Sequence, residues 1–325
     1  MTLKSTIYIV VPCYNEEEVL LDTAARLKSK MDTLAAAGKI SEAYKIAFVD
    51  DGSRDNTWNM IEELCIAESA FAGVKLSRNK GHQNALLAGL FAVMNEADAA
   101  VSIDADLQDD IDAIDKMIDE YLGGCDIVYG VRQNREKDSF FKRSTAEGFY
   151  KLLQALGCDI VFNHADYRLM SSRAIQALMA YSEQGLFLRG LVPMLGYKTT
   201  NVCYARSERQ AGESKYPLKR MLALALDGVA SLSLKPLRII TAVGCIMLVL
   251  SAFLLIYCIV SLCTGRGVFD WRIVTFSIWA VGGLLMLALG IVGEYVGRTF
   301  AETKHRPRFN IETINGLQNI ENIQG

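Results

Sequence analysis

The first 130 residues of the chain alternate short apolar runs with longer amphipathic stretches. The apolar runs predict strands over Ile7–Val11, Ile46–Val49, Val74–Leu76, Ala99–Ile103 and Ile127–Tyr129. The stretches between them carry apolar residues at helical spacing and predict helices over Glu17–Ala37, Thr57–Ser69, Gln83–Asn95 and Ile111–Leu122. Strands that alternate with helices indicate an α/β, Rossmann-like fold whose mostly parallel sheet is covered on both faces.

The last third of the chain has a different pattern, with two long runs that lack charged residues. Between Arg238 and Arg266 lie 27 uncharged residues, and between Arg272 and Glu294 lie 21. Each run is long enough to cross a hydrocarbon core of about 30 Å as a helix. We therefore predict a transmembrane hairpin at 237–297, with spans at about 239–263 and 273–294. Lys and Arg residues flank both ends of the hairpin, which places the flanking segments in the cytoplasm.

These patterns divide the chain into four parts. Residues 1–212 form a cytoplasmic α/β domain, and residues 213–236 form a juxtamembrane segment with apolar positions at helical spacing. That spacing suits a helix that lies on the membrane surface, although a core helix would have a similar pattern. Residues 298–325 form a cytoplasmic tail, which we expect to be loosely ordered after Phe309 because it is polar and has little periodicity.

Composition narrows the functional classes. The 34 Lys and Arg residues against 37 Asp and Glu residues give a net charge of −3, so the chain as a whole has no electrostatic attraction to nucleic acid. The eight cysteines include no C-x-x-C pair, and the three histidines are widely spaced. Neither a disulfide framework nor a zinc site of His and Cys is expected, so any metal should be held by oxygen ligands.

Polar clusters follow four of the predicted strands, at residues 12–16, 50–53, 77–81 and 104–110. The carboxyl ends of parallel strands meet at one edge of a sheet, which is where such folds bind ligands. The chain has no G-x-G-x-x-G after the first strand and no G-x-x-x-x-G-K-[ST], so neither glycine-rich phosphate cradle is predicted. A bound phosphate must therefore be neutralised in another way.

Asp104, Asp106 and Gln108 place three oxygen ligands within five residues, directly after a predicted strand. Mg²⁺ or Mn²⁺ takes one or two carboxylates and completes its shell with water and substrate phosphates, so this run predicts a divalent-cation site. The alternative is a solvated helix start, and we do expect Asp109 or Asp110 to act as an N-cap. Residues 50–53, taken alone, also suit a turn that caps the next helix.

The motifs, in this order, resemble those of glycosyltransferase family 2 enzymes of the GT-A fold. The resemblance rests on V-P-C-Y-N-E at 11–16, V-D-D-G-S-R-D at 49–55, S-R-N-K-G at 77–81 and D-A-D-L-Q-D at 104–109. D-Y-R-L-M at 166–170, G-E-S-K-Y at 212–216 and the predicted hairpin make the chain similar to the polyprenyl-phosphate glycosyltransferases, which include bactoprenol glucosyltransferases and dolichol-phosphate mannose synthases. The resemblance covers roughly residues 5–308.

The resemblance implies roles for individual residues. Asp106 and Gln108 would coordinate Mg²⁺ or Mn²⁺ at the diphosphate of the donor, with Asp104 beside them on the nucleotide side, and Asp166 matches the position usually assigned as catalytic base. The remaining implied contacts are Pro12, Tyr14, Glu16 and Asp51 with the base and ribose, Arg132 and Arg143 with the lipid phosphate, and Arg206, Arg209 and Lys215 with the diphosphate.

The implied activity is inverting transfer of a hexose from a nucleotide sugar to polyprenyl (undecaprenyl) phosphate, with a product used in cell-envelope glycan modification. UDP-glucose is the first choice of donor, while N-acetylglucosamine, galactose, mannose and modified arabinose stay open. Two roles of Asp166 stay open, that of a catalytic base and that of an orienting group. The implied partners are the donor, the lipid acceptor, the inner (plasma) membrane, a downstream flippase and further copies of the chain, for example in a tetramer, with no nucleic acid.

Two other classes of protein would have different sequence features. A processive polysaccharide synthase would need more spans and a Q-x-x-R-W motif, which this chain lacks. A non-catalytic nucleotide-sugar-binding membrane regulator would be expected to have lost the metal motif, whereas D-A-D-L-Q is intact. The sequence therefore favours an enzyme.

Overall fold

The computed structural model describes residues 4–132, 164–181, 188–204, 246, 253 and 271–317. In chain order the described elements are β1 (Ile7–Cys13), α1 (Leu20–Ala36), β2 (Lys45–Asp50), α2 (Thr57–Ala67), β3 (Phe71–Leu76), α3 (His82–Val93), β4 (Ala99–Ser102), α4 (Ala113–Leu122), β5 (Ile127–Arg132), β6 (His164–Ser171), α6 (Ser172–Met179), α7 (Leu188–Met194), β7 (Thr199–Tyr204), α10 (Trp271–Thr303) and β8 (Ile311–Asn315).

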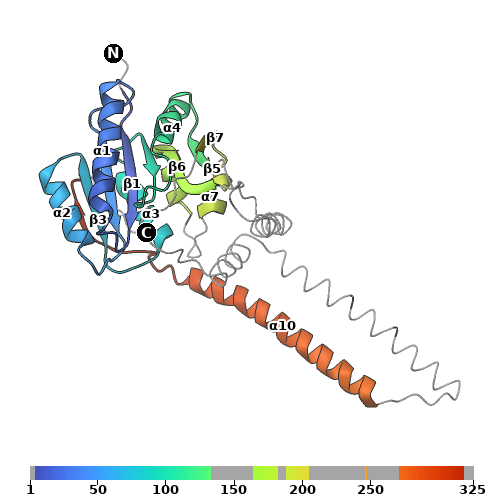
Figure 1. Cartoon of the computed structure of the whole chain (residues 1–325). Coiled ribbons are helices and arrows are strands. Elements are labelled where there is room, and N and C mark those ends of the chain that lie inside the picture. The colour runs from blue at the N-terminus through green and yellow to red at the C-terminus, as the bar shows by residue number, and fades with distance from the viewer. Residues whose placement is uncertain are drawn as a thin grey trace.

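The strands form an eight-stranded sheet in the order β7-β5-β6-β4-β1-β2-β3-β8 (Figure 1). β1 pairs in parallel with β2 and β4, β2 with β3, and β5 with β7, whereas β6 and β8 run antiparallel to their neighbours. The predicted α/β fold with a mostly parallel sheet is therefore confirmed. The strands and helices predicted over the first 130 residues correspond to β1–β5 and α1–α4, with differences of a few residues at their ends.

Apolar clusters cover both faces of the sheet. In β1, Ile7, Ile9 and Val11 face a cluster with α1, α2 and α4, while Tyr8 and Val10 face another with α3, α6 and α7. Every residue of β1 is buried, as expected for a parallel strand covered on both sides. Helix α3 lies so close to the sheet that a Cβ at Gly89 would meet Val10 Cγ1 at 2.4 Å.

The expectation of a loosely ordered tail was wrong for residues 309–317, and residues 318–325 lie outside the described residues. After Thr303 the chain returns to the sheet, where β8 pairs antiparallel with β3. Phe309 is buried against Phe91, with ring centroids 6.4 Å apart, and Arg308 donates a hydrogen bond to the Tyr181 carbonyl. A five-residue strand that gains its stability from pairing with a distant edge strand leaves little periodicity in its own sequence, so the pattern gave no signal.

Helix α10 has 33 residues and projects away from the sheet (Figure 1). The second predicted span, 273–294, lies within it, but α10 continues to Thr303. No helix among the described residues is long and apolar enough to cross a membrane, so the structure does not support the predicted hairpin. Residues 213–236 and all of 239–263 except Ile246 and Phe253 lie outside the described residues.

Candidate active site

The loops after β1 and β2 are joined by hydrogen bonds. The Asn15 N–H donates to Ser53 Oγ at 3.0 Å, and Asn15 Oδ1 accepts from the Arg54 N–H at 2.8 Å. The Glu16 N–H donates to Thr57 Oγ1 at 3.0 Å. Asn15 has a φ of 54°, a left-handed conformation that Asn tolerates better than most residues. The V-P-C-Y-N-E and V-D-D-G-S motifs therefore form one connected wall of the site.

Asp51 fixes the loop between β3 and α3. Its carboxylate accepts hydrogen bonds from the Lys80 N–H at 2.6 Å and the Gly81 N–H at 2.9 Å. Burial raises the pKa of Asp51, while these two N–H groups oppose that rise. Gly52 has a φ of +67°, and a Cβ there would lie 2.6 Å from the Asn79 nitrogen, so the turn requires glycine. Asp51 thus holds the loop that leads directly into His82, the first residue of α3.

The D-A-D-L-Q motif forms a tight turn after β4. Leu107 has a φ of 43°, which is rare for a branched apolar residue, and its burial helps to hold this conformation. The turn brings Asp106 and Gln108 together, so that the Gln108 N–H donates to Asp106 Oδ1 at 3.3 Å and Gln108 Nε2 donates to Asp106 Oδ2 at 2.7 Å. Thr23 Oγ1 anchors the same turn through the Ala105 carbonyl at 2.6 Å.

The chemistry of this turn fits a divalent cation. Asp104 and Asp106 are hard oxygen donors separated by one residue, and Mg²⁺ or Mn²⁺ needs only one or two carboxylates when substrate phosphates complete its shell. Within the described residues, no group of three or more His, Cys, Asp or Glu side chains is arranged to hold a metal ion. Gln108 presents its amide nitrogen to Asp106 here, so in this arrangement it orients that carboxylate.

Asp109 is not a solvated helix cap, contrary to one of our expectations. It is 2% exposed, and its Oδ1 accepts from Arg132 Nη2 at 3.1 Å and from the Tyr204 hydroxyl at 2.7 Å. Burial and the Asp109 charge raise the pKa of Tyr204, so the phenol stays protonated and remains a donor. Asp110 Oδ1 accepts from the Asp112 N–H at 2.9 Å, just before α4 begins. The buried carboxylate serves to orient Arg132 at the end of β5.

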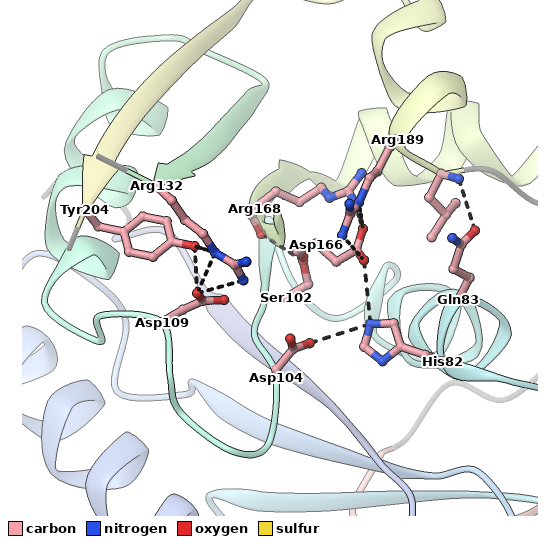
Figure 2. A network of polar contacts seen from close by, with 11 residues as sticks. His82, Gln83, Ser102, Asp104, Asp109, Arg132, Asp166, Arg168, Arg189 and Tyr204 are labelled. Carbon is pink, nitrogen blue, oxygen red and sulfur yellow. Dashed lines mark hydrogen bonds and ion pairs between the residues drawn. The ribbon is translucent and has the colours of Figure 1, made fainter. Parts of the chain in front are cut away.

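Asp166 on β6 lies at the centre of a second polar cluster (Figure 2). Arg168 Nη2 donates to Asp166 Oδ1 at 2.6 Å, and Arg189 Nη2 on α7 donates to Oδ2 at 3.3 Å. His82 Nε2 lies 3.8 Å from Asp166 Oδ2 and 3.6 Å from Asp104 Oδ1, so it stands between the two carboxylates. Although burial raises the pKa of Asp166, the charges of Arg189 and Arg168 hold it well below its usual range.

The structure brings the predicted residues of the central strands to one edge of the sheet. Asp51 follows β2, Asp104 follows β4 and Arg132 ends β5, and β6 pairs with β4 near Asp166. Pro12 lies within β1, and Tyr14 and Glu16 follow it; the Tyr14 side chain is exposed. Four predicted residues lie outside the described residues, namely Arg143, Arg206, Arg209 and Lys215.

From the sequence, Asp109 was only a candidate helix cap. No role was predicted for four other members of these networks, namely His82, Arg168, Arg189 and Tyr204. Arg168 lies within the D-Y-R-L-M motif, and Arg189 lies in F-L-R-G-L at 187–191, but their contacts with Asp166 could not be read from either run. His82 directly follows S-R-N-K-G and could have been found by extending that motif by one residue.

The chain is similar in sequence to known glycosyltransferases. The sequence profile of "Glycosyl transferase family 2" matches residues 8–179. The chain is 48% identical over 304 residues to "Uncharacterized glycosyltransferase YkoT" of Bacillus subtilis (strain 168), covering 94% of this chain and 90% of that one.

Two further relatives have more specific names. "Prophage bactoprenol glucosyl transferase homolog" of Escherichia coli (strain K12) is 36% identical, with coverage of 95% of this chain and 99% of its own. "Bactoprenol glucosyl transferase" of Shigella phage SfV is 35% identical, with coverage of 94% and 98%. Because the profile spans more than half of the chain and these relatives span almost all of it, the chain belongs to glycosyl transferase family 2.

Proposed function

We propose that this glycosyltransferase transfers a hexose, with glucose from UDP-glucose as the first choice, to undecaprenyl phosphate or a similar polyprenyl phosphate. The observation that carries the proposal is the likeness, over almost the full length, to relatives named bactoprenol glucosyl transferase. The second support is the composition of one edge of the sheet. Asp104 and Asp106 are suited to bind a cation there, and Arg132 and Arg189 at the same edge are suited to bind phosphate. Mixed charge of this kind suits a reaction between two phosphorylated substrates.

In the proposed reaction an oxygen of the lipid phosphate attacks the anomeric carbon of the donor. The bond from that carbon to the donor's diphosphate breaks, its electron pair leaves with the nucleoside diphosphate, and a single displacement inverts the configuration. A divalent cation bound at Asp104 and Asp106 would stabilise the charge that develops on the leaving diphosphate. A phosphate monoester has a second pKa near 6 and is largely ionised at neutral pH, so the attacking oxygen needs no strong base.

The remaining residues have roles that follow from their places in the fold. We assign the wall formed by Pro12, Tyr14, Glu16 and Asp51 to the base and ribose, and Arg132 to the lipid phosphate. Arg132 keeps 30% of its side chain exposed while Asp109 and Tyr204 orient it, which suits a guanidinium that must meet a phosphate in a fixed direction. Arg143, Arg206, Arg209 and Lys215 keep the roles that the family resemblance implies.

We further propose that α10 brings the enzyme to the inner membrane, with the sheet domain on the cytoplasmic side. The helix exposes many large apolar side chains, among them Ile278, Leu285, Leu289, Val296 and Phe300. Such a concentration of exposed apolar surface marks contact with lipid or with another protein. Because β8 pairs with β3, the segment after α10 ties the helix to the sheet domain. Flotation with liposomes of undecaprenyl phosphate and phosphatidylglycerol tests this, and a chain that stays in the dense fraction would contradict it.

A donor screen tests the proposed reaction. Purified full-length protein in detergent is supplied with undecaprenyl phosphate, Mg²⁺ or Mn²⁺ and single UDP- or GDP-sugars, and both nucleoside diphosphate and glycolipid are measured. Turnover with UDP-glucose supports the proposal as stated. Turnover with another sugar corrects the donor, and tight nucleotide binding without any lipid product would favour a non-catalytic regulator.

A further inference from the structure

The carboxylate of Asp166 contacts two arginine side chains, those of Arg168 and Arg189. Its Oδ1 accepts from Arg168 Nη2 at 2.6 Å and lies 3.5 Å from Arg189 Nε, while its Oδ2 accepts from Arg189 Nη2 at 3.3 Å. Only 11% of its side chain is exposed. Figure 2 shows the two guanidinium groups converging on this one carboxylate. Both carboxylate oxygens are therefore already engaged with cations.

A general base should be able to take up a proton near the working pH. The positive charges of Arg189 and Arg168 oppose protonation of Asp166 and keep its pKa low despite burial. The proposed acceptor, a phosphate monoester, also has little need of a base. The geometry and the chemistry of the acceptor therefore both point away from proton transfer at Asp166.

Two guanidinium groups share the carboxylate of Asp166, and Asp104 lies beyond His82. Arg168 is 1% exposed. Within the described part of the chain, Arg168 Nε and Nη1 have no hydrogen-bond partner. Arg189 differs because 33% of its side chain is exposed, so it is the member of the cluster that a ligand can reach. A guanidinium that is held in a fixed direction and is accessible to solvent is suited to an anion, and a phosphate matches its planar fork.

We propose that Arg189 binds a phosphoryl oxygen of the substrates and that Asp166 is a positioning residue that fixes Arg189. The phosphoryl group belongs either to the diphosphate of the donor or to the phosphate of the lipid acceptor. This inference rests on the proposed function, because it assigns a role within that same reaction. His82 links the cluster to Asp104, so the guanidinium lies on the same edge as the proposed cation site.

The first test compares Arg189→Ala and Arg189→Lys with the wild type in steady-state kinetics. Arg189→Ala should raise the KM for one of the two substrates about 10- to 100-fold, because a charge-assisted hydrogen bond is lost. Added guanidine hydrochloride at non-denaturing concentration should restore part of the rate, and Arg189→Lys should retain more activity than Arg189→Ala. An increase in the KM for UDP-glucose assigns the donor diphosphate, and an increase in the KM for undecaprenyl phosphate assigns the acceptor.

Arg26→Ala is the matched control, because Arg26 on α1 is 46% exposed and forms a surface ion pair with Asp22 at 3.6 Å. It should leave both KM values unchanged, since surface ion pairs contribute little. Unchanged KM values in Arg189→Ala as well would overturn the proposal.

A double-mutant cycle separates positioning from proton transfer. If Asp166 acts through Arg189, the double variant Asp166→Asn/Arg189→Ala should lose no more than about threefold beyond the worse single variant. If Asp166 acts as an independent base, the two losses should multiply, and that result would overturn the positioning role. Thermal unfolding of each variant checks folding, because Asp166→Asn removes the charge that faces buried Arg168. If Asp166→Asn does not fold, the proposal is tested by the guanidine rescue of Arg189→Ala instead: recovery of activity supports it, and no recovery overturns it.

Binding measurements distinguish failure of this inference from failure of the proposed function. If the wild type shows no turnover, the proposed reaction fails, but calorimetry with UDP and with farnesyl phosphate still tests the anion site. At least a tenfold weaker affinity of Arg189→Ala for one of these probes supports the site. Equal affinities of the wild type and Arg189→Ala for both probes would contradict it.

Discussion

Asp104 and Asp166 lie at the same edge of the sheet, but their surroundings differ. Asp104 has 44% of its side chain exposed, whereas Asp166 has 11% exposed and contacts Arg168 and Arg189. His82 lies within 4 Å of both carboxylates. The two carboxylates share a place at the sheet edge but differ in exposure and in cationic neighbours, and this difference is the basis of the separate roles that we propose for them. The exposed carboxylate can accept a cation, and the enclosed one holds guanidinium groups.

The largest effect is expected on turnover, when a carboxylate of the proposed cation site is removed. Asp106→Ala should lower turnover by about a thousandfold or more, because a bound cation contributes several kcal/mol to stabilising the leaving diphosphate. Asp22→Ala on the surface of α1 is the matched control, since Asp22 is 68% exposed. Turnover and Mn²⁺ binding are measured in parallel. Turnover of Asp106→Ala at the level of the control would remove Asp106 from the cation site.

Replacement of the enclosed carboxylate, Asp166, should lower the free energy of unfolding. Asp166→Ala leaves Arg168 buried without its counter-charge and should lower the free energy of unfolding by about 3–5 kcal/mol. Asp104→Ala should change it by less than about 1 kcal/mol, because 44% of the side chain is exposed and its neighbour His82 is also partly exposed. Urea unfolding followed by circular dichroism measures both values. Similar losses in the two variants would remove the distinction between the two carboxylates.

The contribution of Asp166 to stability should also depend on pH in a defined way. A carboxyl whose pKa is lower in the folded protein contributes stability above its unfolded pKa of about 4 and loses it as pH falls through the folded value. The difference in unfolding free energy between the wild type and Asp166→Asn should therefore be constant from pH 8 to pH 5 and decline only below about pH 4. A change between pH 8 and pH 6 would show that another titrating group controls this cluster.

The smallest effect is expected at Arg132, which Asp109 orients much as Asp166 orients Arg189. Arg132→Ala should raise the KM for undecaprenyl phosphate about tenfold and leave the KM for UDP-glucose nearly unchanged, because the assigned phosphate contact is lost. Initial rates over a matrix of both substrate concentrations give the two values. Equal increases in both would argue against a specific acceptor contact.

The sequence predicted the regular part of the fold well. β1–β5 and α1–α4 follow from apolar runs and helical spacing, because each has a buried face that its own residues record. β6, β7 and β8 were missed, since their stability comes from pairing with strands distant in the chain. β8 shows this most clearly, as a short segment of a polar tail that completes the edge of the sheet beside β3.

The sequence motifs predicted which residues meet at the candidate site, but they did not predict most of the contacts between them. The sequence predicted that Asp51, Asp104 and Asp106 would lie at one edge, because the strand ends of a parallel sheet converge. The bonding of Asp51 to the Lys80 and Gly81 N–H groups could not be read from spacing, and neither could the burial of Asp109. These contacts depend on loop geometry, including the left-handed Leu107, which the residue types alone do not reveal.

The most direct test of the account is to follow a single reaction with UDP-glucose and undecaprenyl phosphate in the wild type and in Asp106→Asn. Mass spectrometry measures the glycolipid, and a coupled assay measures UDP. We predict one UDP released for each undecaprenyl-phosphate-glucose formed by the wild type, an inverted anomeric centre in the product, and almost no product from Asp106→Asn. UDP release without glycolipid, or equal yields from the two proteins, would contradict the proposed transfer at this carboxylate edge.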